Sequence, residues 1–199
     1  MTKYELPLGD EMNPNESGFS VILYKKLIRN WHEKATTEDY FSKFVFEYLA
    51  FNAIIIQKFP SGTGGKDRHA IQGLKSDDNI KQEYLKKINQ NKDLEKLIEY
   101  LNKSPFGGDD ELKWWNCSDP GPCNVPDPGY QTRGTIRDNN DWENMVEFIY
   151  SVRNNLFHGG KDLEDKRDQL LVRHAYKLLR PLVEILLHSK GMGGEIDED

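Results

Sequence analysis

Apolar residues recur three and four positions apart along most of the chain, and this spacing is typical of amphipathic helices. The pattern predicts helices over the ranges 19–34, 36–59, 79–102, 140–158 and 162–189. No stretch alternates between apolar and polar residues with the period of a strand over more than a few positions. We therefore expect an all-α protein, built as an antiparallel helical bundle with long irregular insertions.

Capping residues and helix breakers set the expected ends of several helices. Thr36 or Thr37 can cap the second helix, and the polar run 89–91 predicts a kink or a break within the third. The segment 140–143 begins with Asn and ends with Glu, which is the form of a capping box and predicts a helix start. The glycine pair 159–160 is expected to end that helix, because glycine readily follows a helix C-terminus.

The 199-residue chain fits a single domain with two insertions. We place the domain at 19–189, with a Gly-rich connector at 60–79 and a second insertion at 103–140. The second insertion holds five of the nine prolines and five of the sixteen glycines, so we expect neither helix nor sheet there. Residues 1–18 are interpreted as an extended arm, and residues 190–199 as an acidic, disordered tail.

Composition narrows the class of protein. Charged residues make up 30% of the chain, yet 9 Phe, 9 Tyr and 4 Trp supply enough apolar surface for a core, which excludes full disorder. There are 27 Lys and Arg against 33 Asp and Glu, so the net charge of −6 excludes a generally basic nucleic-acid coat protein. Two cysteines are too few for a disulfide scaffold, and no apolar run approaches the ~20 residues of a membrane span. We expect a cytoplasmic protein without membrane contact.

The segment 152–161 gathers most of the residues that can carry chemistry. It places Arg153, Asn154 and His158 at the end of an amphipathic helix, with Lys161 three positions further on. Arginine is a permanently charged fork that suits phosphate, and histidine titrates near neutral pH. Together they suffice for attack of a ribose 2′-hydroxyl on the adjacent phosphate, without a metal or another cofactor.

The spacing of Arg153 and His158 leaves two interpretations open. On a continuous helix their side chains would point roughly 140° apart, but the two following glycines allow the helix to unwind near Phe157. We then expect the imidazole to fold back toward the guanidinium. The alternative is structural: His158 belongs to the C-cap of the helix, where imidazolium is favoured, and Arg153 pairs with a surface acid such as Glu147. Spacing alone favours the structural alternative.

The run from Arg153 to His158 resembles the signature of the HEPN superfamily, in which Arg is followed by Asn and then by a His at this spacing. The segment 48–53 is similar to the apolar first-helix segment of such proteins, in which an Asn interrupts the core face. The order of helices also fits, with the motif near the end of the penultimate helix. The resemblance covers residues 37–189 apart from the two insertions.

This resemblance implies a metal-independent endoribonuclease that cleaves RNA as a homodimer, with two motifs facing each other across a cleft. Arg153 and His158 would be the catalytic pair, and Asn154 would support them. Many HEPN proteins are toxins or antiviral defence effectors, which implies an antitoxin or a regulatory protein as a partner. The family also contains inactive members that bind nucleotides or act as interaction modules, and the sequence does not separate these two classes.

Several further residues keep two interpretations. Asn52 lies on the apolar stripe of the second helix, where it either hydrogen-bonds the motif or is a satisfied core amide. Lys161 either meets substrate phosphate or is an ordinary loop lysine, and Glu47 is interpreted as a solvated residue of a helix face. A last alternative is a helical regulatory domain whose 103–140 insertion binds a protein partner. Seven basic and five acidic residues in 147–180 predict a modest basic cleft with weak, salt-sensitive RNA binding.

Overall fold

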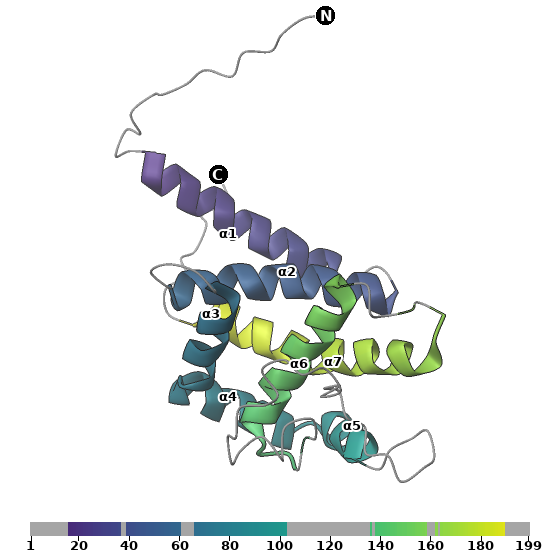
Figure 1. Ribbon diagram of the computed structural model, residues 1–199. Coiled ribbons are helices and arrows are strands. Elements are labelled where there is room, and N and C mark those ends of the chain that lie inside the picture. The colour runs from purple at the N-terminus through teal and green to yellow at the C-terminus, as the bar shows by residue number, and fades with distance from the viewer. Residues whose placement is uncertain are drawn as a thin grey trace, which may run out of the picture.

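The computed structural model describes residues 16–36, 39–60, 66–102, 136, 138–158, 162 and 164–189. These residues form seven helices and no strand, which confirms the all-α expectation for the described part of the chain. The helices, shown in Figure 1, are α1 (Glu16–Lys34), α2 (Tyr40–Lys58), α3 (Lys66–Lys75), α4 (Asp78–Asn89), α5 (Lys92–Asn102), α6 (Trp142–Phe157) and α7 (Lys166–His188). None of them is both long and apolar enough to cross a membrane.

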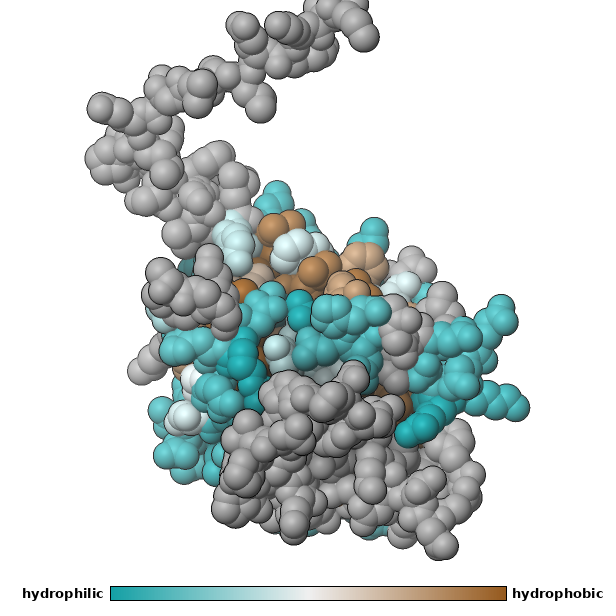
Figure 2. All heavy atoms as spheres, in the orientation of Figure 1, coloured by the Kyte–Doolittle hydropathy of each residue, from teal (hydrophilic) through white to brown (hydrophobic). Residues whose placement is uncertain are grey.

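Helices α2 and α7 form the centre of the bundle and pack extensively against each other. Figure 1 shows α1 lying along the outer side of α2, while α6 runs steeply across α7. On the face seen in Figure 2, hydrophobic residues gather where α1 lies over α2, and hydrophilic residues cover the end of the molecule where α7 begins. Leu27 of α1 remains 40% exposed.

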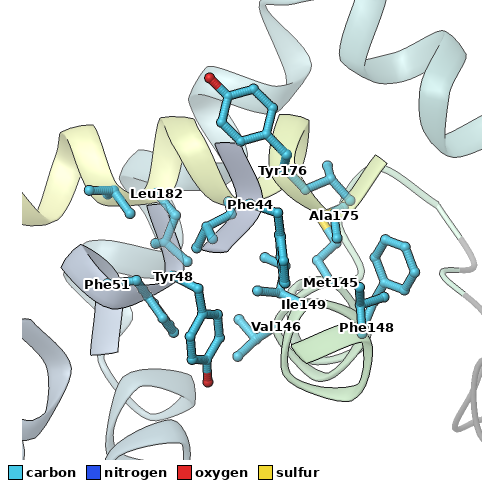
Figure 3. Packing of buried hydrophobic residues seen from close by; sticks show 14 of the residues in the cluster. Phe44, Tyr48, Phe51, Met145, Val146, Phe148, Ile149, Ala175, Tyr176 and Leu182 are labelled. Carbon is cyan, nitrogen blue, oxygen red and sulfur yellow. The ribbon is translucent and has the colours of Figure 1, made fainter. Parts of the chain in front are cut away.

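The centre of the core is built by one face of each of three helices. Three- and four-residue spacing places the buried side chains of a helix on a single stripe, which the sequence pattern predicts. Figure 3 shows these stripes meeting, with Phe44, Tyr48 and Phe51 from α2, Met145, Val146 and Ile149 from α6, and Ala175 and Leu182 from α7.

The start of α2 differs from the prediction. Asp39 caps this helix in place of Thr36 or Thr37, and its carboxylate accepts hydrogen bonds from the backbone N–H groups of Phe41 and Ser42 at 2.8 and 3.2 Å. A carboxylate is favoured at this position because the helix dipole presents partial positive charge there. The sequence pattern placed the same residue in the first turn of the helix.

The starts of α6 and α7 were also predicted too early. Asp141 occupies the cap position of α6 but makes no side-chain capping bond, because its Oδ2 accepts a hydrogen bond from Asn144 Nδ2 at 2.8 Å. The expected capping box over 140–143 is therefore wrong. Helix α7 begins at Lys166, where the Asp165 carboxylate accepts from the Asp168 N–H at 2.9 Å.

The interpretation of 60–79 as a connector is wrong for residues 66–75, which form α3. Ala70, Ile71 and Leu74 are buried on one face of this short helix. Gly73 belongs to the same packing, since a Cβ atom there would lie 2.8 Å from the ring of Phe59. This glycine therefore reflects close helix packing, although in the sequence it reads as part of a linker. The break over 89–91 is confirmed, because α4 ends at Asn89 and α5 begins at Lys92.

The boundary of the N-terminal arm also changes, because α1 begins at Glu16 and the last three residues of the range 1–18 are helical. The remaining expectations for 1–15, for most of the 103–140 insertion and for the tail 190–199 lie outside the described residues.

Glu47 is fully buried, so its interpretation as a solvated residue is wrong. Its Oε1 lies 2.8 Å from Nδ1 of His32 in α1, and its Oε2 lies 3.6 Å from Nη1 of Arg180 in α7. Burial raises the pKa of Glu47, and the neighbouring His32 and Arg180 offset only part of that rise. The residue therefore links three helices through one buried carboxylate.

Candidate functional site

Arg153 lies near the end of α6 and is held by three different helices. Its Nη1 donates a hydrogen bond to Oδ1 of Asn154 at 2.9 Å, and its Nη2 donates to Oδ2 of Asp67 in α3 at 3.1 Å. The guanidinium also lies over two aromatic rings, 5.4 Å from the ring centre of Tyr48 in α2 and 5.1 Å from that of Phe157. With 23% of its side chain exposed, Arg153 is anchored while it still reaches solvent.

His158 directly follows the last residue of α6. Its backbone N–H donates to the carbonyl of Asn154 at 3.0 Å, which makes it the C-cap residue, and its side chain is exposed. The helix does end at Phe157, as expected. The imidazole, however, makes no hydrogen bond with the Arg153 guanidinium among the contacts of the described residues. The structure thus places both residues at one helix end without joining them.

The structural alternative, in which Arg153 pairs with an acid, is confirmed, but the expected partner is wrong. Arg153 does pair with an acid, but that acid is Asp67 and not Glu147. Glu147 is buried, and it binds Nη1 of Arg68 at 2.7 Å and Nζ of Lys75 at 2.6 Å. Burial alone would raise the pKa of Glu147, but the charges and hydrogen bonds of Lys75 and Arg68 outweigh it and hold the pKa below its usual value.

Three buried polar atoms of α2 and α6 have no hydrogen-bond partner among the described residues: Nε of Arg153, Oη of Tyr48 and Oδ1 of Asn52. Asn52 lies one helical turn beyond Tyr48 on α2. Both interpretations of Asn52 are therefore wrong, because its buried Oδ1 accepts no hydrogen bond from the motif or from any other described residue. A buried polar group without a partner costs about 1–3 kcal/mol, and groups of this kind often belong to functional sites.

The hydroxyl of Tyr48 is a donor at neutral pH. Figure 3 shows its ring packed within the apolar cluster while the hydroxyl points out of it. Burial raises the pKa of Tyr48 well above its ordinary value; Arg153 partly lowers it, whereas Asp67 and Tyr150 raise it further. The hydroxyl therefore keeps its proton and presents it beside the guanidinium.

Sequence reasoning missed Asp67 and Arg68, because both lie in the segment interpreted as a connector. The spacing of Ala70, Ile71 and Leu74 is the signal that could have identified α3. Lys161 and the glycine pair 159–160 lie outside the described residues. Within the described part of the chain, no three His, Cys, Asp or Glu side chains gather closely enough to share a metal ion.

At the level of chemistry, the end of α6 offers an anchored cation, an exposed imidazole and a buried hydroxyl donor. A guanidinium of this kind can hold a phosphate oxygen, and an imidazole can move a proton.

The chain was compared with protein-family models, with curated proteins and with solved structures, and none of the three comparisons found a match.

Proposed function

We propose that the protein is a metal-independent endoribonuclease of the HEPN type, and that the end of α6 is its catalytic site. The observation that carries this proposal is the position of Arg153 and His158, one fixed on aromatic rings and the other exposed, at the end of one helix. The resemblance of the run from Arg153 to His158 to the HEPN signature supports the same function.

In the reaction, the 2′-oxygen of a ribose attacks the adjacent phosphorus, and the bond from phosphorus to the 5′-oxygen breaks. His158 would take the proton from the 2′-hydroxyl, and Arg153 would stabilise the negative charge that develops on the phosphate oxygens. The leaving 5′-oxygen also takes up a proton, which the same histidine of a second copy of the chain would donate. The products would be a 2′,3′-cyclic phosphate and a free 5′-hydroxyl.

One Arg and one His supply few groups for both proton transfers, so we propose that two copies of the chain share the reaction across a two-fold axis. The ring of Phe157, 50% exposed beside His158, would then be covered by the partner copy. Sedimentation of the active enzyme tests this point: full activity in a monomer would contradict the shared site.

The decisive experiment incubates purified protein with RNA in the presence of EDTA. We expect cleavage to persist and the products to carry 2′,3′-cyclic phosphate ends. Products with 3′-hydroxyl ends would contradict the mechanism. A toxin or antiviral role, with an antitoxin or another regulatory protein as partner, belongs to the same proposal and is tested by expressing the wild type and the Arg153→Ala variant in cells.

A second candidate is an inactive HEPN module that binds nucleotides or proteins. The pairing of Arg153 with Asp67, together with the lack of a bond to His158, favours this candidate. It predicts that Arg153→Ala changes oligomeric state or stability, and that the wild type cuts no RNA. The EDTA experiment therefore separates the two candidates.

A further inference from the structure

A cavity of about 560 Å³ lies between the first turns of α2 and α7, outside the candidate catalytic site. Tyr40 and Phe41 form its wall on the α2 side, and Lys166, Leu170 and Arg173 form its wall on the α7 side. Its volume lies within the range of small-molecule sites, and its lining combines an apolar surface with positive charge. This combination indicates a ligand that is both apolar and anionic.

The cations of this cavity have no acidic partner within the described part of the chain. Lys166 and Arg173 are exposed, and neither forms an ion pair with a carboxylate anywhere in the described residues. Asp39 is the acid of the wall, and its carboxylate accepts hydrogen bonds from the Ser42 hydroxyl and from the N–H groups of Phe41 and Ser42. The carboxylate is thus held at the cap of α2, and the charged groups of the lining, two cations and one anion, leave an excess of one positive charge for a ligand.

Tyr40 contacts one cation of the cavity, Arg173, and the neighbouring Lys43, without neutralising either. Cζ of Arg173 lies 5.3 Å from its ring centre, and Nζ of Lys43 lies 5.0 Å from it. The ring is itself fixed by an edge contact with Tyr176, at a centroid distance of 5.9 Å. A cation over an aromatic face is attracted to it but keeps its full charge, unlike a cation paired with a carboxylate. Arg173 is therefore positioned in advance for an anion.

The cavity and the candidate catalytic site lie along the same helix. Phe41 of the cavity wall and Tyr48 beneath Arg153 are seven residues apart, so they occupy the same face of α2 about 10 Å apart along its axis.

We propose that this cavity binds one nucleotide unit, with Lys166 and Arg173 holding its phosphate and the wall of Tyr40, Phe41 and Leu170 receiving its base. This proposal rests on the proposed function in one respect, namely that the polymer bound in the cavity is RNA. A free nucleotide offers the same phosphate and base, so the experiment must distinguish the two sources.

The test measures binding of two probes to the full chain. The first is a short, fluorescent single-stranded RNA with 2′-O-methyl groups throughout, which cannot be cleaved by 2′-hydroxyl attack; the second is AMP. The variant Lys166→Gln/Arg173→Gln should bind the oligonucleotide at least about tenfold more weakly at low salt. The slope of log affinity against log salt should fall by about 0.7, because one neutralised phosphate is lost.

A matched control removes two charges elsewhere. Lys81→Gln/Lys86→Gln changes two lysines of α4, and α4 packs near the other end of α7, where Lys87 pairs with Glu184. We expect this control to keep oligonucleotide affinity within about twofold. Circular dichroism should show both variants to be folded, since all four residues are solvent-accessible.

Each outcome decides the proposal. Equal losses of RNA affinity in both double variants would overturn it in favour of general charge attraction. Unchanged binding of both RNA and AMP in the cavity variant would also overturn it. AMP binding that is lost in the cavity variant, with RNA binding unaffected, would support the site but assign it to a free nucleotide. If the cavity variant cleaves RNA with an unchanged KM, nucleotide binding in the cavity is contradicted and the proposed function is not. If RNA binds through the cavity but is never cleaved, the proposed function is contradicted and the cavity site is not.

Discussion

Two groups of cations in this protein differ in what surrounds them. Along α6, three cations each have an acid: Arg153 pairs with Asp67, and Arg68 and Lys75 share Glu147. Between the first turns of α2 and α7, the cations Lys43, Lys166 and Arg173 have no carboxylate partner among the described residues.

This difference indicates which region suits the binding of a phosphate and which suits the chemical step. A cation in an ion pair is fixed in position, but a phosphate must compete with the acid before the cation can bind it. An unpaired cation attracts anions from solution and contributes to the rate of encounter. We infer that the cavity contributes most to RNA binding, and that the end of α6 contributes most to the chemical step.

The largest expected effect follows from removing the proton-transfer group. His158→Ala should lower kcat for RNA cleavage about 1,000-fold, because general acid–base catalysis typically contributes 10²–10⁴-fold, while affinity for the uncleavable oligonucleotide stays unchanged. His188→Ala is the control, since His188 is exposed at the far end of α7. A variant with full activity would show that the end of α6 does not carry the chemistry, and the contrast between the two regions would disappear.

A large effect on stability is expected from Glu147→Gln. This substitution leaves Lys75, whose side chain is 9% exposed, without its acid, and breaking a buried ion pair costs about 3–5 kcal/mol of unfolding free energy. Urea denaturation measures the loss. Glu143→Gln, at an exposed position of the same helix, should stay within about 0.5 kcal/mol. A small loss at Glu147 would mean that the pairing near the motif contributes little.

The same carboxylate makes stability depend on pH. Because the pKa of Glu147 is lower in the folded protein than in the unfolded chain, its contribution is fully present above the unfolded value of about 4.3 and is lost as the pH falls through the folded value. We expect the difference in unfolding free energy between wild type and Glu147→Gln to shrink as the pH is lowered below that value. A difference that stays constant down to pH 3 would indicate that the ion pairs do not carry the stability.

The smallest effect is expected from Asp67→Asn, which removes the acid from Arg153. Asp67 is 32% exposed, so the pair contributes no more than about 1 kcal/mol, and freeing the guanidinium should raise affinity for the uncleavable oligonucleotide about two- to fivefold. Asp93→Asn in α5 is the control for the loss of one negative charge. A lower affinity in Asp67→Asn would show that the acid positions Arg153 and does not compete with phosphate.

Helices were predictable here where local spacing determines them. The stripes of α2, α6 and α7 follow from three- and four-residue periodicity, because each depends only on residues within a few turns of each other. The motif residues Arg153 and His158 were found in the same way, as near neighbours in sequence.

The ion pairs and the helix cap that the sequence did not predict depend on distant residues or on competition between nearby ones. The bond from Arg153 to Asp67 joins residues 86 positions apart, and no local pattern indicates it. Asp39 and Thr37 compete for one cap position, and only the path of the backbone decides between them. Glu47 reads as a surface residue because its partners come from α1 and α7.

The buried carboxylate of Glu47 also has a consequence for the register in which α1 docks. Two apolar helix faces can slide past each other by one turn, about 5.4 Å, and still bury similar surface. Such a slip would carry His32 away from Glu47 and leave the carboxylate facing Arg180 alone. Because a buried polar group that loses its hydrogen-bond partner is costly, the contact between His32 and Glu47 favours one docking position among those that apolar contact alone would allow.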